Sequence, residues 1–297
     1  MSALGLDVGG TKIAAGLVGL DGTAVEVTTA PTVGSGRAVV NQVAAIIDGY
    51  LVAHRIETVG LAVPGGVDPR TGVVIAASNL GWRDLDLLGA LRPRLPPSVF
   101  LHVDNDANAA AWAEHRFGGY RHEGSLVLVT IGTGIGGGIV VDGRVVRGLT
   151  GAGGEIGHLP LRPGGRVCEC GARGCWEQYA SGRALDRGAR AAGWGGPTAG
   201  YDVLLAAGRG DQAATGVVGE VVADLVHGIA VLTAVLDPAL VLLGGGLGSD
   251  PGFQVFVQAA ASAATVTAPR ARVPIGPASL GVLAGVIGAG DLARAEG

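Results

Sequence analysis

The chain has 297 residues, and its 48% hydrophobic content is enough to bury the cores of about two domains. Its 21 Lys and Arg residues are balanced by 25 Asp and Glu residues, so the charge does not indicate nucleic acid or an anionic membrane as a partner. The start of the chain, MSALGLDVGG, lacks signal-peptide features, and the uncharged stretches are interrupted by Gly, Pro, Gln or Thr. We expect a soluble cytoplasmic protein without a membrane span.

The first predicted element is a strand that ends at Asp7 and leads into a glycine turn and a second strand. The turn consists of Gly9, Gly10 and Thr11. Backbone N–H groups in such a turn can bind phosphate oxygens, the threonine hydroxyl adds a donor, and Lys12 can supply positive charge. Asp7 is placed to hold hydrated Mg²⁺ near the phosphates, or else it caps the turn through an Asx hydrogen bond.

Another predicted strand ends near Val103 and is followed by an alanine-rich helix that begins near Ala107. Between them stand Asp104, Asn105 and Asp106, at a strand end of the kind that binds ligands in α/β proteins. A carboxylate at this point can act as a general base toward a hydroxyl group, or it can cap the helix N-terminus. Both roles can hold at once.

The segment 125–131, SLVLVTI, predicts another strand before a second glycine turn. That turn consists of Gly132, Thr133 and Gly134, and its spacing matches G-x-G-x-x-G. A dinucleotide fingerprint requires a helix after the glycines, but GIVVDGRVV predicts a strand and a hairpin, so we reject that interpretation. The segment instead repeats the N-terminal strand–glycine turn–strand unit, which favours two related halves over two ordinary hairpins.

All three cysteines of the chain, Cys168, Cys170 and Cys175, lie within eight residues, and His158 precedes them by ten. Three thiols cannot all form disulfides with one another, and a cytoplasmic location disfavours a disulfide. Three thiolates and one imidazole suit a closed, tetrahedral, structural zinc site. The alternative is three unrelated thiols.

Beyond Gly182 the pattern is mainly helical. A long apolar helix ends at Asp237-Pro238, a buried strand at 239–243 meets a third glycine turn, and GVLAGVIGAGDLA predicts a closing helix. We expect this last helix to return to the N-terminal domain. The predicted domains are therefore a small α/β domain, 1–107 plus about 281–297, and a large α/β domain, 108–280, that carries the zinc loop.

Several motifs, in this order, resemble the ROK family of sugar kinases and repressors, most closely its bacterial glucokinases of the actinobacterial type. They are DVGGTK (7–12), VPGGVD (63–68), DNDANAAAWAE (104–114), IGTGIGGGIV (131–140), GGEIGH (153–158) and CECGARGCWEQYASG (168–182). The resemblance covers nearly the whole chain. It implies the actin-like ATPase (ribonuclease H-like) fold, an α/β fold with two domains and a cleft in which ATP and sugar meet.

The resemblance also implies an activity, the phosphorylation of the 6-hydroxyl of glucose by ATP, with Mg²⁺ and a structural Zn²⁺ and with a homodimer or homotetramer as the assembly. Asp106 is the implied base. The implied sugar-binding residues are Gly65, Asn79, Asn105, Asp106, Glu155, His158 and Glu177. The family places adenosine over the third glycine turn, which consists of Gly244, Gly245 and Gly246.

Alternatives remain at several of these positions. Instead of binding sugar, Asn79 can be a plain turn residue, and Glu155 and Glu177 can be solvated side chains. Instead of binding adenosine, the third glycine turn can be a connecting loop. Asp104 is the substitute for Asp106 as the base. Another hexose (fructose, mannose, allose or N-acetylmannosamine) and polyphosphate as donor both stay open, because hydroxyl discrimination depends on fine placement of the same side chains. A sugar-binding transcriptional regulator is disfavoured by the acidic charge.

Overall fold

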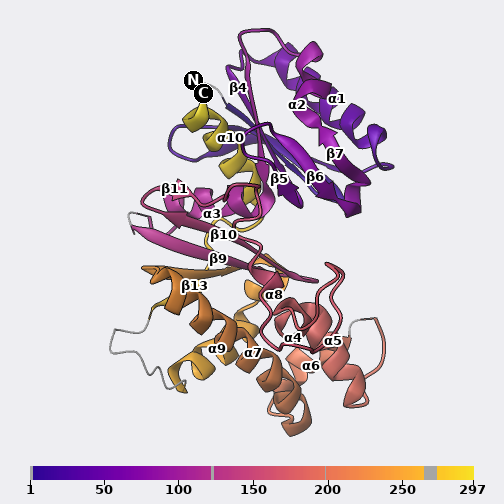
Figure 1. Cartoon of the computed structure of the whole chain (residues 1–297), viewed down its shortest axis with the longest axis vertical. Helices are drawn as coiled ribbons and strands as arrows, with labels where there is room; N and C mark the ends of the chain where they lie inside the picture. The colour runs from indigo at the N-terminus through magenta and orange to yellow at the C-terminus, as the bar shows by residue number, and fades with distance from the viewer. Residues whose placement is uncertain (1–2, 122–123, 198, 264–272) are drawn as a thin grey trace. The chain divides into compact units, whose positions relative to one another are not determined.

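The computed structural model describes residues 3–121, 124–197, 199–263 and 273–297 (Figure 1). The chain is a mixture of helices and strands that divides into two compact units. The first unit comprises Met1–Glu123, Gly138–Gly154 and Ser279–Gly297, and the second comprises Gly124–Gly137 and Glu155–Ala278. Each unit is therefore built from segments that are separated in the sequence. The predicted domain limits near residues 107 and 281 stay a prediction.

The first unit contains a five-stranded sheet in the order β3-β2-β1-β4-β8. Its strands are β1 Ala3–Val8, β2 Lys12–Val18, β3 Ala24–Pro31, β4 Thr58–Val63 and β8 Phe100–Asn105. β1, β4 and β8 are parallel, whereas β2 runs antiparallel to both of its neighbours, β1 and β3. Asp7 pairs with Ala62, which in turn pairs with Asp104, so the two carboxylates stand in one row across the carboxyl ends of the parallel strands.

The remaining elements of the first unit surround this sheet. A small antiparallel sheet holds β5 Gly66–Val67, β6 Val73–Ala77 and β7 Trp82–Asp86. The helices are α1 Arg37–Ala53, α2 Leu87–Leu91, α3 Asp106–Phe117 and α10 Ala284–Glu296, with 3₁₀ turns η1 Ser78–Leu80, η2 Arg92–Arg94 and η4 Gly281–Leu283. The pair β10 Ile135–Val141 and β11 Arg144–Val145 is antiparallel and enters this unit at Gly138.

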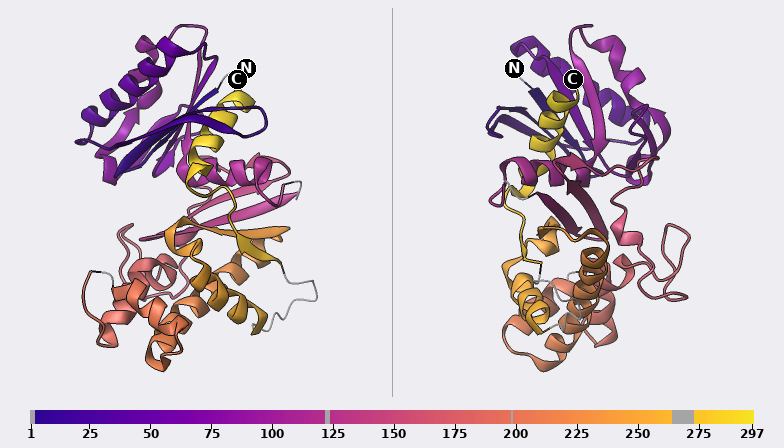
Figure 2. Two further views of the ribbon diagram at one scale, coloured as in Figure 1. Left: turned by 180° about the vertical axis from the view of Figure 1, so that it is seen from behind. Right: turned by 60° about the vertical axis from the view of Figure 1, so that its left-hand side comes forward.

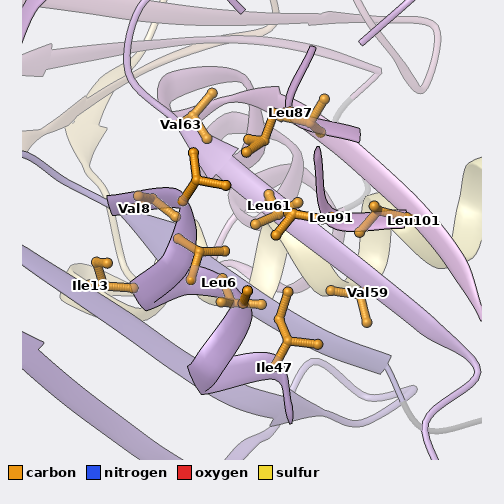
Figure 3. Packing of buried hydrophobic residues seen from close by; sticks show 14 of the residues in the cluster. Leu6, Val8, Ile13, Ile47, Val59, Leu61, Val63, Leu87, Leu91 and Leu101 are labelled. Carbon is orange, nitrogen blue, oxygen red and sulfur yellow. The ribbon is translucent and has the colours of Figure 1, made fainter. Parts of the chain in front are cut away.

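One face of the parallel strands forms the main core of the first unit. Leu6 from β1 and Leu61 from β4 pack with Ile47 from α1 and with Leu87 and Leu91 from α2 (Figure 3). All five side chains are at most 1% exposed. Parallel strands are covered on both faces, which explains why β4 reads as a continuous apolar run instead of an alternating pattern.

The helix α10 covers the other face of these strands, as both views in Figure 2 show. It lies so close that a Cβ atom on Gly5 would be 1.9 Å from the Val286 carbonyl oxygen, and one on Gly60 would be 1.8 Å from that of Ala289. Only glycine permits this approach of helix and strand backbones. The predicted return of the closing helix to the N-terminal strands is therefore confirmed.

The second unit is built on three parallel strands with helices packed around them. β9 Ser125–Ile131, β12 Leu240–Gly244 and β13 Ile275–Pro277 lie side by side in that order. The helices are α4 Glu177–Ala180, α5 Gly182–Ala191, α6 Ala199–Gly208, α7 Gln212–Leu236, α8 Gly245–Gly248 and α9 Pro251–Ala263, with the 3₁₀ turn η3 Ile156–His158.

Among the described residues, α7 is the one helix that is long and apolar enough to cross a membrane. Its composition alone does not assign it to a membrane, because the core helices of globular proteins pass the same test. Within the second unit α7 packs against α4, α5, α6 and α9. Its buried residues, among them Val218, Leu225 and Ile229, are thus used in helix packing.

Most predicted elements are found within one or two residues of their expected limits. The strand over 125–131 is confirmed, and a strand rather than a helix follows its glycine turn. The helix α3 begins at Asp106, one residue before its predicted start, because Asn105 provides the N-cap. The closing helix begins at Ala284, since Gly281–Leu283 form a 3₁₀ turn.

Candidate active site

The N-terminal glycine turn is a tight loop with an accessible rim. Gly9 N–H donates to the Lys12 carbonyl at 2.9 Å, and the Thr32 hydroxyl donates to the Gly9 carbonyl at 2.7 Å. Thr11 and Lys12 are exposed. A Cβ atom on Gly10 would lie 3.1 Å from Cβ of Asn79, so a predicted phosphate-binding residue and a predicted sugar-binding residue are neighbours.

Asp7 lies beside this turn, at the end of β1. Burial raises the pKa of its carboxyl group, and the positive charge of Lys12 acts in the opposite direction. A Cβ atom on Gly285 of α10 would be 2.6 Å from Asp7 Oδ2, so the carboxylate packs directly against that helix. A confined carboxylate with a raised pKa is stabilised by a cation, which fits the predicted Mg²⁺ role.

The corner between β8 and α3 holds the predicted base. Asn105 caps α3, since its Oδ1 accepts the backbone N–H groups of Ala107 at 2.9 Å and Asn108 at 3.1 Å. Its Nδ2 donates to the Gly65 carbonyl at 3.0 Å, which brings two predicted sugar-binding residues together. Asp106 is the first residue of α3, where negative charge is favoured, and it is half-buried.

Asp104, the substitute candidate for the base, is in a different environment. Its side chain is 4% exposed, and Oδ2 accepts a hydrogen bond of 2.7 Å from Arg147 Nε. Burial acts to raise its pKa, but contacts with His102 and Asn108 and the charge of Arg147 outweigh burial and hold the pKa below its usual value. A buried, weakly basic carboxylate is a poor proton acceptor, which argues against Asp104 as the base.

In the second unit, the glycine turn after β9 lines a cavity of about 280 Å³. Gly132 and Thr133 accept backbone hydrogen bonds from the start of α5, at 2.8 and 3.3 Å, which fixes the turn. The third glycine turn contributes one residue of the lining. The lining residues are Gly132, Thr133, Gly182, Arg183, Leu185, Asp186, Gly200, Tyr201, Leu204, Gly246, Leu247 and Asp250.

The three predicted nucleotide-binding residues of the third glycine turn therefore differ in position. Gly246 lines the cavity, whereas Gly245 packs on β9: it has a φ of +76°, and a Cβ atom there would be 2.6 Å from the Ile131 carbonyl oxygen. Gly244 is the N-cap of α8. Sequence reasoning missed the polar lining residues, Arg183, Asp186, Tyr201 and Asp250, because no motif marks them.

The predicted zinc ligands converge in the second unit. One ligand atom from each of His158, Cys168, Cys170 and Cys175 lies within 4.8 Å of the others. Cys168 Sγ is 3.6 Å from His158 Nδ1, and the sulfur atoms of Cys170 and Cys175 are 3.6 Å apart. The four side chains thus form a site that can hold a structural zinc ion.

The thiols of this cluster differ in acidity before a metal binds. Burial raises the pKa of Cys168, and burial together with the neighbouring thiols raises that of Cys175 to about 12. A backbone hydrogen bond from Ala172 lowers the pKa of the exposed Cys170. Burial and the negative charge of a neighbouring thiolate both disfavour ionisation of a thiol. A divalent cation bound to the sulfur atoms offsets both effects and stabilises the thiolates.

The three predicted sugar ligands of the second unit meet at this cluster. Glu155 Oε2 is 3.8 Å from His158 Nε2, and Glu177 Oε1 accepts a hydrogen bond of 3.1 Å from Cys168 Sγ. Nδ1 of His158 faces the sulfur atoms while Nε2 faces Glu155. This orientation leaves Nε2 and two carboxylates as polar groups beside the metal ligands.

Residues 3–296 match the ROK family. The chain belongs to the ROK family. It is 37% identical, over 98% of this chain and 97% of the relative, to a protein of Streptomyces coelicolor named glucokinase. It is 34% identical, over 99% of this chain and 98% of the relative, to a protein of Yersinia pseudotuberculosis named N-acetylmannosamine kinase.

A solved ROK structure shares the fold of the whole chain. The ROK family glucokinase from Streptomyces griseus, in complex with glucose and AMPPNP, superimposes with a TM-score of 0.84 at 34% identity and covers 99% of this chain and 100% of its own. The predicted actin-like ATPase fold class and the resemblance to ROK sugar kinases are confirmed.

Proposed function

We propose that this ROK protein transfers the γ-phosphoryl group of ATP to the 6-hydroxyl of glucose. The observation that carries the proposal is the convergence of Glu155, His158 and Glu177 on a Cys₃His cluster, because polar groups suited to bind sugar hydroxyls stand beside a loop that a metal ion would hold rigid. The similarity to proteins named glucokinase supports glucose as the substrate.

The first unit holds the proposed base and the proposed magnesium ligand. In the first unit, Asp106 takes the proton of the attacking hydroxyl while the γ-phosphorus bonds to that oxygen and ADP leaves. Asn105, Gly65 and Asn79 hold sugar hydroxyl groups through amide and backbone atoms. Asp7 would hold hydrated Mg²⁺, which supplies charge neutralisation at the phosphates.

In the second unit, we assign the sugar and the nucleotide to different groups. Glu155 and Glu177 accept hydroxyl hydrogens, and Nε2 of His158 forms a third hydrogen bond to the sugar. His158 Nδ1 and the three cysteines would hold zinc. The turn Gly132–Gly134 and the cavity that it shares with Gly246 accommodate the nucleotide, and the turn at Gly9–Lys12 of the first unit binds phosphate oxygens.

A panel of hexoses tested with ATP and with polyphosphate, with kcat/KM as the readout, decides the proposal. We expect glucose with ATP to give the highest value and glucose 6-phosphate as the product. The second candidate substrate is N-acetylmannosamine, because a relative of that name is 34% identical over nearly the whole chain. A higher kcat/KM for N-acetylmannosamine, or for polyphosphate as donor, would replace the corresponding part of the proposal.

Two further parts of the proposal concern the cellular location and the oligomeric state of the enzyme. We place it in the cytoplasm, and we expect a homodimer or homotetramer, which light scattering of the purified protein measures. A monomer at micromolar concentration would contradict the expected assembly without affecting the proposed chemistry.

A further inference from the structure

A buried ionic network lies directly behind the corner that carries Asp106. Asp104 Oδ1 accepts the backbone N–H of Asn105 at 2.7 Å and the Nδ2 of Asn108 at 3.0 Å. These two donors stand on either side of Asp106 in the chain. Asp104 is therefore attached both to the backbone that enters α3 and to its first turn, and Asp106 lies between the two points of attachment.

Arg147 holds the other oxygen of this carboxylate. Its Nε donates to Asp104 Oδ2 at 2.7 Å, and its guanidinium group forms an ion pair of 3.0 Å with Glu296 of α10. The Arg147 side chain is 19% exposed and that of Asp104 is 4% exposed. His102 Nε2 lies 3.7 Å from the same Oδ2. Because Arg147 occupies Oδ2, Oδ1 stays available for the two donors at the corner.

The loop that carries Arg147 is itself closely packed. The Arg147 carbonyl accepts the backbone N–H of Gly153 at 2.8 Å. Gly151 has a φ of +78°, and a Cβ atom on it would lie 1.8 Å from the Val67 carbonyl oxygen. The backbone of this loop is thus fixed by its own contacts, and Arg147 reaches Asp104 from a rigid support.

We propose that Asp104 and Arg147 are positioning residues, whose ion pair fixes the backbone of Asn105 and thereby the placement of the Asp106 carboxylate for proton removal. The inference rests on the proposed function of Asp106. An ion pair that only stabilised the fold would not need to connect the N-cap residue and the first turn of α3. A displacement of about 1 Å at a catalytic group lowers the rate by about 100-fold. The gain in rate from correct placement therefore offsets the free-energy cost of burying the Asp104–Arg147 ion pair.

Arg147→Met tests this role, with Arg294→Met as the matched control. Arg294 also belongs to the first unit and is 11% exposed, it pairs with Asp291 at 2.7 Å, and it donates to the Val18 carbonyl at 2.7 Å. Both substitutions leave a buried carboxylate with one fewer cationic partner, so both should lower Tm. Only Arg147→Met disturbs the corner at Asn105.

Two readouts separate positioning from stability. Hydrogen–deuterium exchange of peptides that cover 104–110 should accelerate in Arg147→Met and stay at the wild-type rate in Arg294→Met. With substrates, Arg147→Met should lower kcat by about 10- to 100-fold with KM for ATP nearly unchanged. Arg147→Lys should recover part of kcat, because lysine restores the charge but not the fork of donors.

Two results would overturn the inference. Unchanged exchange at 104–110 in Arg147→Met would show that the ion pair does not hold the corner. Equal kcat in Arg147→Met and Arg294→Met, at equal loss of Tm, would show that it contributes stability alone. If the wild type phosphorylates no sugar, the proposed function fails, and the exchange measurement still decides whether Arg147 holds the corner.

Discussion

The carboxylate of Glu177 lies directly against Gly134: a Cβ atom on Gly134 would be 2.5 Å from Glu177 Oε2. The glycine turn after β9 and Glu177, which stands two positions after the last cysteine ligand, are therefore in contact within the second unit. The other oxygen of Glu177 accepts a hydrogen bond from Cys168. Glu177 thus connects the proposed phosphate-binding turn to the Cys₃His cluster.

We predict that Gly134→Ala weakens sugar binding with little loss of stability. The new methyl group displaces the flexible end of Glu177, which costs little in packing but moves a proposed sugar ligand. We expect sugar affinity, measured by calorimetry without nucleotide, to fall by about tenfold, since a lost hydrogen bond to a charged group is worth about 1.5–3 kcal/mol. Gly132→Ala, where a Cβ atom meets nothing within 4 Å, should retain sugar affinity. Equal losses in the two variants would contradict the role of Glu177.

Asp106→Asn should lower kcat by about 10²- to 10⁴-fold, because a general base typically contributes that much. Tm should change little, since the amide retains the size of the side chain. Asp48→Asn, which removes a surface ion pair with Arg94, serves as the control and should leave kcat unchanged. An unchanged kcat in Asp106→Asn would show that another group acts as the base.

The Cys₃His cluster predicts one zinc ion per chain and proton release when zinc binds the apoprotein. Protons leave because the pKa of Cys175 is about 12 without metal, so its thiol is neutral at pH 7. Calorimetry in two buffers of different ionisation enthalpy measures this release, and zinc affinity should fall as the pH is lowered.

Cys170→Ser should lose zinc and lower glucose affinity by about tenfold or more, while nucleotide binding is better retained. Ala172→Ser, an exposed position in the same loop, is the control and should keep one zinc per chain. Active wild-type protein that contains no zinc would exclude the metal site. A zinc-free Cys170→Ser with normal glucose affinity would exclude only the coupling.

Asp7→Asn should raise Tm at pH 7 and weaken the use of Mg²⁺. Burial raises the folded-state pKa of Asp7 above its unfolded value, so its contribution to stability is greatest below pH ~4 and declines as the pH rises through the folded pKa. The amide does not ionise and lacks this decline. The Mg²⁺ concentration for half-maximal activity should increase by about 10- to 100-fold. A lower Tm at pH 7 would indicate that Asp7 is stabilised by hydrogen bonds rather than destabilised by burial.

Features set by neighbouring residues could be predicted from the sequence. The Cys₃His cluster spans a short segment, so spacing alone indicated its members, and the β-branched residues after Gly134 excluded a helix there. The Asp104–Arg147 pair could not be predicted, because 43 positions separate the two residues and no motif marks Arg147. The same holds for Tyr201 in the cavity, which its helix brings there through packing.

The close contact of α10 with Gly5 and Gly60 has a consequence for biosynthesis. The N-terminal strands leave the ribosome early, but the helix that covers their second face is translated only after the whole second unit. At about 5–20 residues per second, this apolar face stays uncovered for tens of seconds. A nascent chain in this interval is a substrate for chaperones, and a premature stop codon shortly before α10 would leave the amino-terminal sheet permanently without its cover.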